Sequence, residues 1–175
     1  CRIIELKELI RGLHAAGIRV IMDVVYNHVY EVSMHSLHKT VPGYFFRYDK
    51  KGTLANGTGV GNDTASERLM MRKYILDSIR YWLEEYQLDG FRFDLMGIHD
   101  VVTMNEVRKA ADSIDPSIII LGEGWNLDTT LPQKGRAWQG NADQMPRIGH
   151  FNDVIRDAAR GPMFHPHSTG FLTGH

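Results

Sequence analysis

The sequence has 175 residues, of which 43% are hydrophobic, and its formal net charge is −1. No basic block or stripe occurs, which argues against a nucleic-acid partner. No apolar run approaches the roughly 20 residues that cross a bilayer, so no membrane partner is expected either. The single cysteine, Cys1, excludes an internal disulfide and a cysteine-based zinc site. Nothing in the sequence predicts a protein partner.

The first third of the chain predicts a helix followed by a buried strand. Apolar residues recur at helical spacing over 3–16, and Gly17 is a good stop for that helix. Residues 18–25 are β-branched and almost continuously apolar, as in a strand covered on both faces. Residues 29–63 show no sustained period, so we interpret them as an inserted excursion, with a short hairpin expected within 44–54.

The rest of the chain alternates predicted helices with predicted strands. The pattern Thr64-x-x-Glu67 is typical of a capping box, which predicts a helix from there to about Tyr86. The further elements, all predicted from apolar patterning, are strand 88–95, helix 105–114, strand 118–121, a short strand within 148–153 and helix 154–160. This alternation is typical of an α/β fold with a parallel sheet.

Polar residues follow three of these strands at the point where each ends. They are Asp23 with Asn27 and His28, Arg92 with Asp94, and Glu123. Polar groups at the carboxyl ends of successive parallel strands favour a (β/α)8 barrel, whose active site lies on that face. A doubly wound open sheet has the same local pattern, but no glycine-rich phosphate loop follows any of these strands.

The stretch Gly-Phe-Arg-Phe-Asp at 90–94 combines two bulky aromatic residues with two charges. Alternation along a strand would put Phe91, Phe93 and Leu95 on one face. Arg92 and Asp94 would then share the other face. One interpretation is an edge strand with a solvated polar face; the other is a paired arginine and aspartate at a functional site.

Three short motifs resemble the first three conserved regions of the alpha-amylase family of glycoside hydrolases (family 13). They are Asp-Val-Val-Tyr-Asn-His at 23–28, Gly-Phe-Arg-Phe-Asp at 90–94 and Gly-Glu at 122–123. Within that family the details are most similar to type I pullulanases. Those details are Asp-Leu-Met-Gly at 94–97, Gly-Glu-Gly-Trp at 122–125, the stretch 61–67 and the stretch 148–161.

The resemblance implies that residues 1–175 are a fragment of one catalytic (β/α)8 barrel, from about its second helix to its sixth strand, with both barrel ends missing. The excursion at 29–63 would then be an insertion after the third barrel strand. The implied activity is retaining hydrolysis of alpha-1,6-glucosidic branch linkages in pullulan, starch or glycogen-type alpha-glucans, with the isolated fragment inactive. Alternatives are isoamylase-type debranching, a glucan branching transferase, and a non-catalytic alpha-glucan-binding barrel.

Retaining glycoside hydrolysis needs two carboxyl groups about 5–5.5 Å apart. By resemblance, Asp94 is the nucleophile and Glu123 the general acid/base. Arg92 would position Asp94 by its opposite charge and contribute to substrate binding. We expect Asp23 to be a structural partner of Arg92.

Further residues are assigned by resemblance to substrate binding or structural support. His28 is expected to contact the sugar at the cleavage point. Trp125 and Tyr26 could stack on sugar faces, although core packing explains Tyr26 equally well.

No cofactor is required by this chemistry. Asn27 provides structural support and matches a calcium-binding position in many alpha-amylases, so a structural calcium ion is left open. We interpret His165-Pro166-His167 as loop residues and not as a metal site. The sequence leaves a cytoplasmic and an extracellular location equally open.

Overall fold

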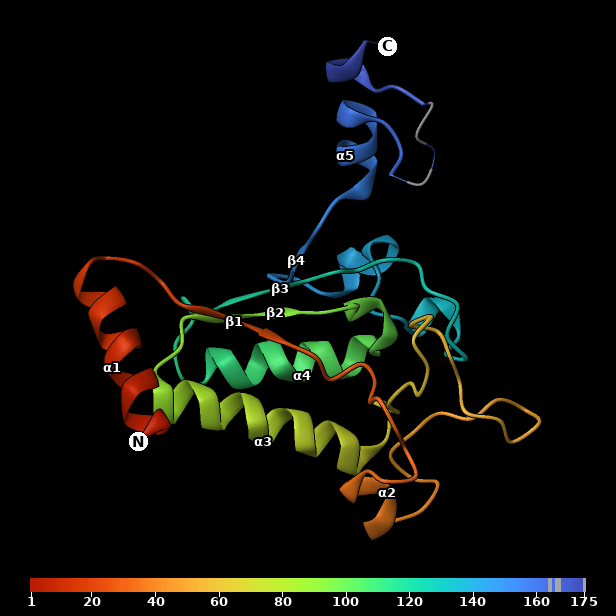
Figure 1. Ribbon diagram of the computed structural model, residues 1–175, viewed down its shortest axis with the longest axis horizontal. Helices are drawn as coiled ribbons and strands as arrows, with labels where there is room; N and C mark the ends of the chain where they lie inside the picture. Colours follow the sequence, from red (N-terminus) through yellow and green to blue (C-terminus); the bar gives the residue numbers. More distant parts are fainter. Residues whose placement is uncertain (164, 166–167, 175) are drawn as a thin grey trace.

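A computed structural model describes residues 1–163, 165 and 168–174 (Figure 1). Its centre is a parallel sheet in the order β1-β2-β3-β4. The strands are β1 (Ile21–Val24), β2 (Gly90–Phe93), β3 (Ile119–Gly122) and β4 (Gly149–His150). The α-helices are α1 (Arg2–Ala15), α2 (Ser36–Thr40), α3 (Leu69–Tyr86), α4 (Val101–Asp112) and α5 (Asp153–Arg160). The predicted α/β class with a parallel sheet is confirmed.

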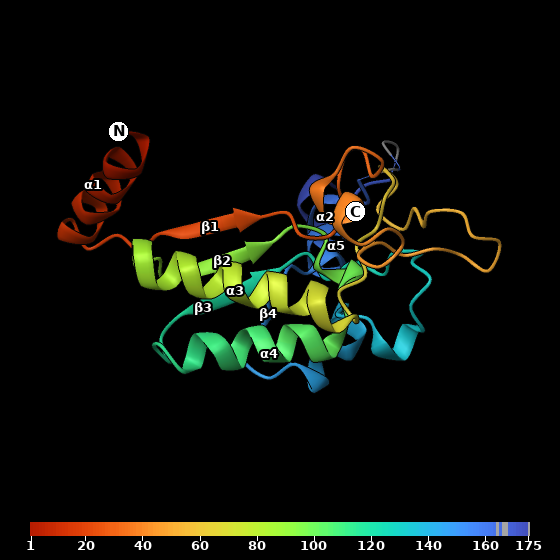
Figure 2. The same cartoon turned by 90° about the horizontal axis from the view of Figure 1, so that it is seen from below.

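Helices α3 and α4 cover one face of the sheet and bury most of the core (Figure 2). The buried positions of α3 recur every three or four residues and so form one stripe: Met71, Ile75, Ile79, Leu83 and Tyr86. Phe91 and Phe93 of β2 are fully buried. Arg92, the charged residue of β2, therefore points away from the layer of α3 and α4.

The register of the sheet brings the predicted polar clusters to one edge. Val24 pairs with Phe93, and Phe93 pairs with Gly122. The residues that follow these strand ends, Asp94 and Glu123, therefore lie side by side. The backbone N–H of Glu123 donates to the carbonyl of Phe93 at 3.0 Å, which fixes this alignment beyond the last paired residues.

The strand at β2 is shorter than predicted. Arg92 does lie on the face opposite Phe91 and Phe93, as alternation requires. The prediction that Leu95 continues the aromatic face is wrong, because Leu95 has a φ of 41° and turns the chain out of the sheet. A short 3₁₀ turn, Met96–Ile98, follows at once.

Two predicted helix starts are also wrong. Helix α3 begins at Leu69, after Arg68 at its N-cap, and not at the expected capping box. The hydroxyl of Thr64 instead donates to the carbonyl of Tyr26 at 2.6 Å. Helix α4 begins four residues earlier than predicted, because the Asp100 side chain accepts a hydrogen bond from Thr103 N–H and caps it.

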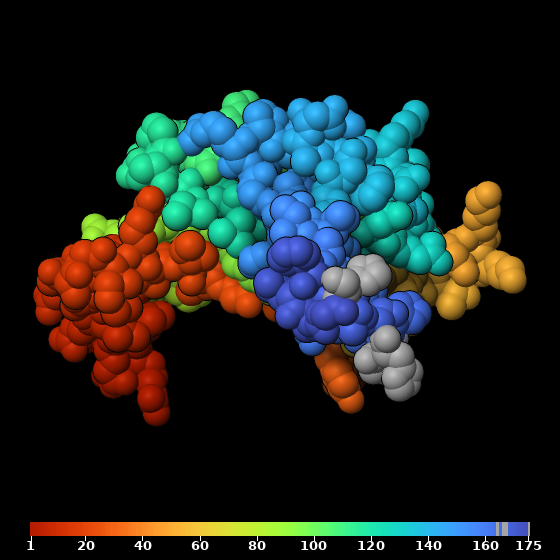
Figure 3. All heavy atoms as spheres, turned by 90° about the horizontal axis from the view of Figure 1, so that it is seen from above, coloured from red at the N-terminus to blue at the C-terminus, as the bar shows by residue number. Residues whose placement is uncertain are grey.

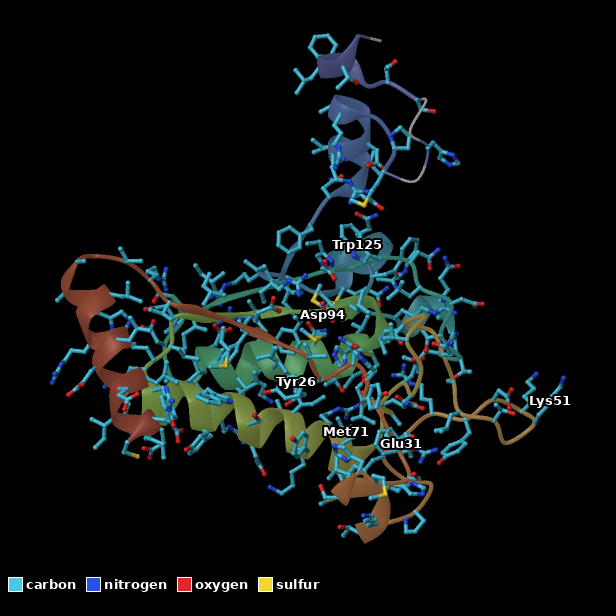
Figure 4. All side chains as sticks on the ribbon, viewed as in Figure 1. Tyr26, Glu31, Lys51, Met71, Asp94 and Trp125 are labelled. Atoms are coloured by element: carbon cyan, nitrogen blue, oxygen red, sulfur yellow. The ribbon has the colours of Figure 1, made fainter. Side chains whose placement is uncertain are left out.

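The excursion is irregular, as predicted, but it folds back onto the sheet edge. An antiparallel bridge between Tyr48 and Leu54 confirms the short hairpin, and Lys51 lies at its tip (Figure 4). The single short helix α2 was not predicted. A second bridge joins Phe46 to Thr64 and returns the chain to the sheet.

The C-terminal segment with α5 lies on the face of the sheet opposite α3 and α4 (Figure 1). Seen from above, it projects over the middle of the molecule while α1 lies at one end (Figure 3). Across the described ranges, none of the helices is both long and apolar enough to span a membrane.

Candidate active site

Arg92 is the centre of a cluster of carboxylates at the ends of β1, β2 and β3. Its guanidinium lies 2.8 Å from Asp23 Oδ1, 2.9 Å from Asp94 Oδ1 and 2.6 Å from Glu123 Oε1. Two terminal nitrogens thus contact three carboxylates, an arrangement that suits the planar fork of an arginine. The expected contacts of Arg92 with Asp94 and of Asp23 with Arg92 are present.

The charge balance of the cluster follows from these contacts. Burial alone would lower the pKa of Arg92, but hydrogen bonds to Asp23 and Asp94 and the charge of Glu123 raise it above its ordinary value. The guanidinium is therefore a permanent cation between the two candidate catalytic groups. The side chains of Asp94 and Glu123 are 27% and 21% exposed, so a ligand can reach both.

Glu123 is held by the loop after β2 as well as by Arg92. Leu95 N–H donates to Glu123 Oε2 at 3.2 Å, and Gly97 N–H donates to the Glu123 carbonyl at 3.1 Å. Gly97 has no room for a side chain, because a Cβ there would lie 2.1 Å from the carbonyl oxygen of Trp125. The loops after β2 and β3 are therefore packed backbone to backbone, and this contact fixes the position of Glu123.

Asn27 links His28 to Asp94. The amide nitrogen of Asn27 donates to Asp94 Oδ2 at 3.0 Å and to the Asp94 carbonyl at 2.7 Å. Its amide oxygen must therefore accept, and His28 Nδ1 lies 2.5 Å from it. This assigns a proton to Nδ1 of His28 and leaves Nε2 for another partner.

The position expected for a structural calcium ion is Asn27, whose side-chain oxygen lies 2.5 Å from His28 Nδ1. Within the part of the chain that the structure describes, no group of three or more His, Cys, Asp or Glu side chains could hold a metal ion. Of the His165-Pro166-His167 motif, Pro166 and His167 lie outside the described residues.

Tyr26 does not line the site. Its hydroxyl lies 2.7 Å from Ser78 Oγ of α3, and its ring contacts Phe93 and Tyr74. Burial raises the pKa of Tyr26, which fits this packed position. The geometry therefore favours core packing over the sugar-stacking assignment, since the side chain points toward α3 (Figure 4).

A pocket of about 390 Å³ opens beside the carboxylates. It is lined by Arg92, Glu123, Trp125, Phe151, Asn152 and Arg156. The guanidinium of Arg156 lies 5.6 Å from the centre of the Trp125 ring, and that of Arg92 lies 5.9 Å from the centre of the Phe151 ring. A larger hollow of about 720 Å³ lies between α1 and α3, but neither Asp94 nor Glu123 lines it.

Sequence reasoning found both carboxylates and Trp125 but assigned no role to Phe151 or Arg156. Asn152, the N-cap of α5, and Arg156 within that helix are four residues apart, and this spacing was the available signal. His150 lies next to this wall, and burial lowers the pKa of its imidazole. The residues that line the pocket thus come from the ends of the three strands β2, β3 and β4 and from the start of α5.

Two carboxyl groups at neighbouring strand ends, beside a pocket with aromatic walls, are the kind of arrangement that the class of glycoside hydrolases uses. Sequence relatives agree with this class. The chain is 55% identical to a pullulanase of Bacillus subtilis over 170 residues, which is 97% of the chain and 24% of that protein. It is 41% identical to the chloroplastic pullulanase 1 of Arabidopsis thaliana over 192 residues, which is 99% of the chain and 20% of that protein.

Solved structures give the same answer. A pullulanase from Paenibacillus barengoltzii, in complex with maltohexaose and alpha-cyclodextrin, matches with a TM-score of 0.97 and 54% identity. That match covers 100% of this chain and 27% of the other. A maltotetraose complex of an Anoxybacillus pullulanase matches with a TM-score of 0.97 and 57% identity, covering 99% of this chain and 26% of the other.

No protein-family model matches the chain. The chain spans about a quarter of the length of the Bacillus subtilis relative. Over nearly its whole length it is a homologue of the pullulanases, which are glycoside hydrolases, and it corresponds to one segment of such an enzyme.

Proposed function

We propose that this chain forms the catalytic centre of a retaining glycoside hydrolase that cleaves alpha-1,6-glucosidic branch linkages. The observation that carries the proposal is the Arg92 guanidinium, which holds Asp94 and Glu123 at adjacent strand ends. Two carboxyl groups on one guanidinium are close enough to act on the same glycosidic bond. Homology to the pullulanases supports the choice of linkage.

In the first step, the Asp94 carboxylate attacks the anomeric carbon. The bond from that carbon to the glycosidic oxygen breaks, and the Glu123 carboxylic acid gives its proton to the departing oxygen. In the resting geometry Glu123 forms an ion pair with Arg92 and accepts a hydrogen bond from Leu95 N–H. Protonation weakens its pairing with Arg92, so the acid can turn toward the leaving group.

In the second step, Glu123, now a carboxylate, removes a proton from water. The resulting nucleophile attacks the anomeric carbon, the bond to Asp94 breaks, and the configuration is retained. Asn27 holds Asp94 Oδ2 while Arg92 holds Oδ1, so both oxygens are oriented before attack. His28, with its proton on Nδ1, can accept a sugar hydroxyl at Nε2.

The proposed substrates are pullulan, starch and glycogen-type alpha-glucans. The relatives' crystal structures hold linear maltooligosaccharides and alpha-cyclodextrin, which supports an alpha-glucan ligand here. Trp125 is the side chain in the pocket best suited to stack on a sugar face, with Arg156 packed against the same ring. The mechanism requires no cofactor, and chelation is expected to leave activity unchanged.

We further propose that residues 1–175 are one part of a (β/α)8 barrel, from its second helix to about its sixth strand. The uniformly parallel order β1-β2-β3-β4 supports this arrangement. Exposed apolar side chains on β1, such as Ile21, and on α1, such as Ile4 and Leu9, are the surfaces that further barrel elements would cover. The excursion at 29–63 would be an insertion on the catalytic face.

The test uses the full-length protein that carries this sequence, incubated with pullulan. Release of maltotriose is expected, because only cleavage of alpha-1,6 bonds yields that product from pullulan. Part of the chain is also 42% identical, over 101 residues, to an isoamylase of rice, so isoamylase-type debranching is the second candidate. Activity on glycogen without release of maltotriose would favour that candidate, and formation of new branches would favour a transferase.

A different measurement tests the alternative of a non-catalytic glucan-binding barrel. Asp94→Asn in the full-length protein should abolish turnover and leave alpha-cyclodextrin binding intact. Because Asn has nearly the same size as Asp, retained binding of alpha-cyclodextrin would show that the variant is folded. Unchanged turnover would refute the role of Asp94 as nucleophile.

A further inference from the structure

Arg47, in the excursion, is one of the most deeply buried charged side chains of the described residues, with 2% of its surface exposed. All five of its guanidinium N–H groups have acceptors. Nε and one Nη2 hydrogen donate to the Glu67 carboxylate, at 3.0 Å and 2.8 Å to Oε2. The others donate to Ser66 Oγ at 3.2 Å, the Ile98 carbonyl at 2.6 Å and Thr129 Oγ1 at 3.0 Å.

These acceptors belong to the three loops that carry the proposed catalytic machinery. Glu67 lies near the end of the long segment between β1 and α3. Ile98 lies in the loop after β2, and Thr129 lies in the loop after β3. The backbone of Arg47 is fixed as well, with its N–H bonded to the Asp63 carbonyl at 2.9 Å. A single guanidinium therefore ties the three loops together at one point.

The connection to Glu123 runs through a strained turn. Leu95 has a φ of 41°, a conformation that costs a non-glycine residue about 1–3 kcal/mol unless its surroundings hold it. At the start of this turn, Leu95 N–H donates to Glu123 Oε2 at 3.2 Å. Arg47 holds the other end of the same turn, because it binds the carbonyl of Ile98.

A second contact supports the loop after β3 from the same side. Gly57 of the excursion packs so closely on Thr129 that a Cβ would lie 2.9 Å from Thr129 Cα. Thr129 is 4% exposed, and its hydroxyl accepts from Arg47. The excursion thus supports both loops that position Glu123. It contacts the loop after β2 through a hydrogen bond to Ile98, and the loop after β3 through a hydrogen bond to Thr129 and the close packing of Gly57.

We propose that Arg47 is a positioning residue for the general acid/base, acting through Ile98 and Thr129 on the orientation of Glu123. This inference rests on the proposed function. It assigns the excursion a catalytic purpose, since its buried arginine keeps the loops after β2 and β3 in the geometry in which Glu123 can donate its proton.

The test compares two matched pairs of variants in the full-length protein. Arg47→Met removes every hydrogen bond of the Arg47 side chain. Arg72→Met is its control, because Arg72 bonds to Thr103, Asp100 and the Glu67 carbonyl but to neither Ile98 nor Thr129. Thr129→Val removes one hydroxyl that Arg47 binds. Its control is Thr103→Val. The hydroxyl of Thr103 is also buried, but it bonds to Ser66 and Asp100 and not to Arg47.

Turnover of pullulan is measured below the unfolding temperature of every variant, beside turnover of alpha-maltotriosyl fluoride. Fluoride leaves without needing a proton, so the second substrate bypasses the acid role of Glu123. We expect kcat on pullulan to fall about 10²-fold for Arg47→Met and about fivefold for Thr129→Val, with KM little changed. The loss on the fluoride should be at least tenfold smaller for Arg47→Met. Both controls should lower Tm and leave kcat on pullulan within twofold of wild type.

Two results would overturn the inference. One is a kcat on pullulan within twofold of wild type for Thr129→Val and for folded Arg47→Met. The other is an equal loss on both substrates, which would show that proton donation by Glu123 is not the step that Arg47 supports. Should Arg47→Met not fold, the Thr129→Val pair decides alone. The variant Asp94→Asn distinguishes a failure of this inference from a failure of the proposed function. If the Arg47 test fails while wild type is active and Asp94→Asn is inactive, the role of Arg47 is refuted and the proposed function stands.

Discussion

His99 is a fully buried histidine whose protonation should control acid stability. Its ring packs edge-on against Phe93, and among the described residues neither ring nitrogen has a hydrogen-bond partner. Burial and the positive charge of Arg47 lower its pKa from 6.5 to about 4, against the opposing charges of Asp100 and Asp94. The unfolded chain therefore binds this proton more readily than the folded chain does.

The sign and size of the effect follow from linkage. Between pH 6.5 and 4 the unfolded state carries the additional proton, so the free energy of unfolding falls as the pH is lowered through that window. The loss from His99 is about 2 kcal/mol at pH 5 and approaches about 3 kcal/mol near pH 4. A stability present at pH 7 is thus lost in the mildly acidic range.

The assay is denaturant unfolding of wild type and His99→Leu at pH 7.5 and pH 5. His99→Leu should lose about 2 kcal/mol less than wild type between the two values. The difference between the proteins is needed because His150, with a pKa also lowered by burial, contributes in the same direction. Asp100 also has a lowered pKa, so its contribution disappears only at lower pH. Equal losses for both proteins would refute the assignment to His99.

The remaining predictions concern the site itself. Arg92→Lys should lower kcat/KM on pullulan by at least about 10²-fold, because a single ammonium nitrogen cannot take the places of the two guanidinium nitrogens that contact Asp23, Asp94 and Glu123. Asp23→Asn is its control, since Asp23 is 63% exposed and should cost less than fivefold; similar losses would contradict the central role of Arg92. Gly97→Ala should reduce both kcat and Tm, because its Cβ would meet the Trp125 carbonyl at 2.1 Å. Gly135→Ala, with open space around its Cβ, should change neither, and an equally harmless Gly97→Ala would refute the packing of the two loops.

The features that could be predicted from the sequence are those set by the periodicity of side chains along a strand and by the order of the strands. Alternation along β2 separated Phe93 from Arg92 correctly, because side chains on a strand point to opposite faces whatever surrounds them. The order of strand ends then brought Asp94 and Glu123 together, since parallel strands align their carboxyl ends. These features depend on local pattern and on sheet geometry alone.

Features that depend on tertiary contacts were not predictable. Thr64 matched a capping box, but its hydroxyl bonds to the Tyr26 carbonyl, and the helix starts at Leu69. Tyr26 follows a strand end like a site residue, yet Ser78 on α3 takes its hydroxyl. Arg47 gives no sequence signal at all, because its acceptors are up to 82 residues away along the chain.

The most direct test of the central claim is covalent trapping of the enzyme. A fluorinated maltosyl fluoride that forms the glycosyl–enzyme intermediate faster than water removes it is added to the full-length protein, and the labelled peptide is sequenced by mass spectrometry. The account predicts one glycosyl group on Asp94, and the same label should accumulate faster than it is lost in a Glu123→Ala variant. A label on Glu123, or an unlabelled enzyme that releases inverted product, would contradict it.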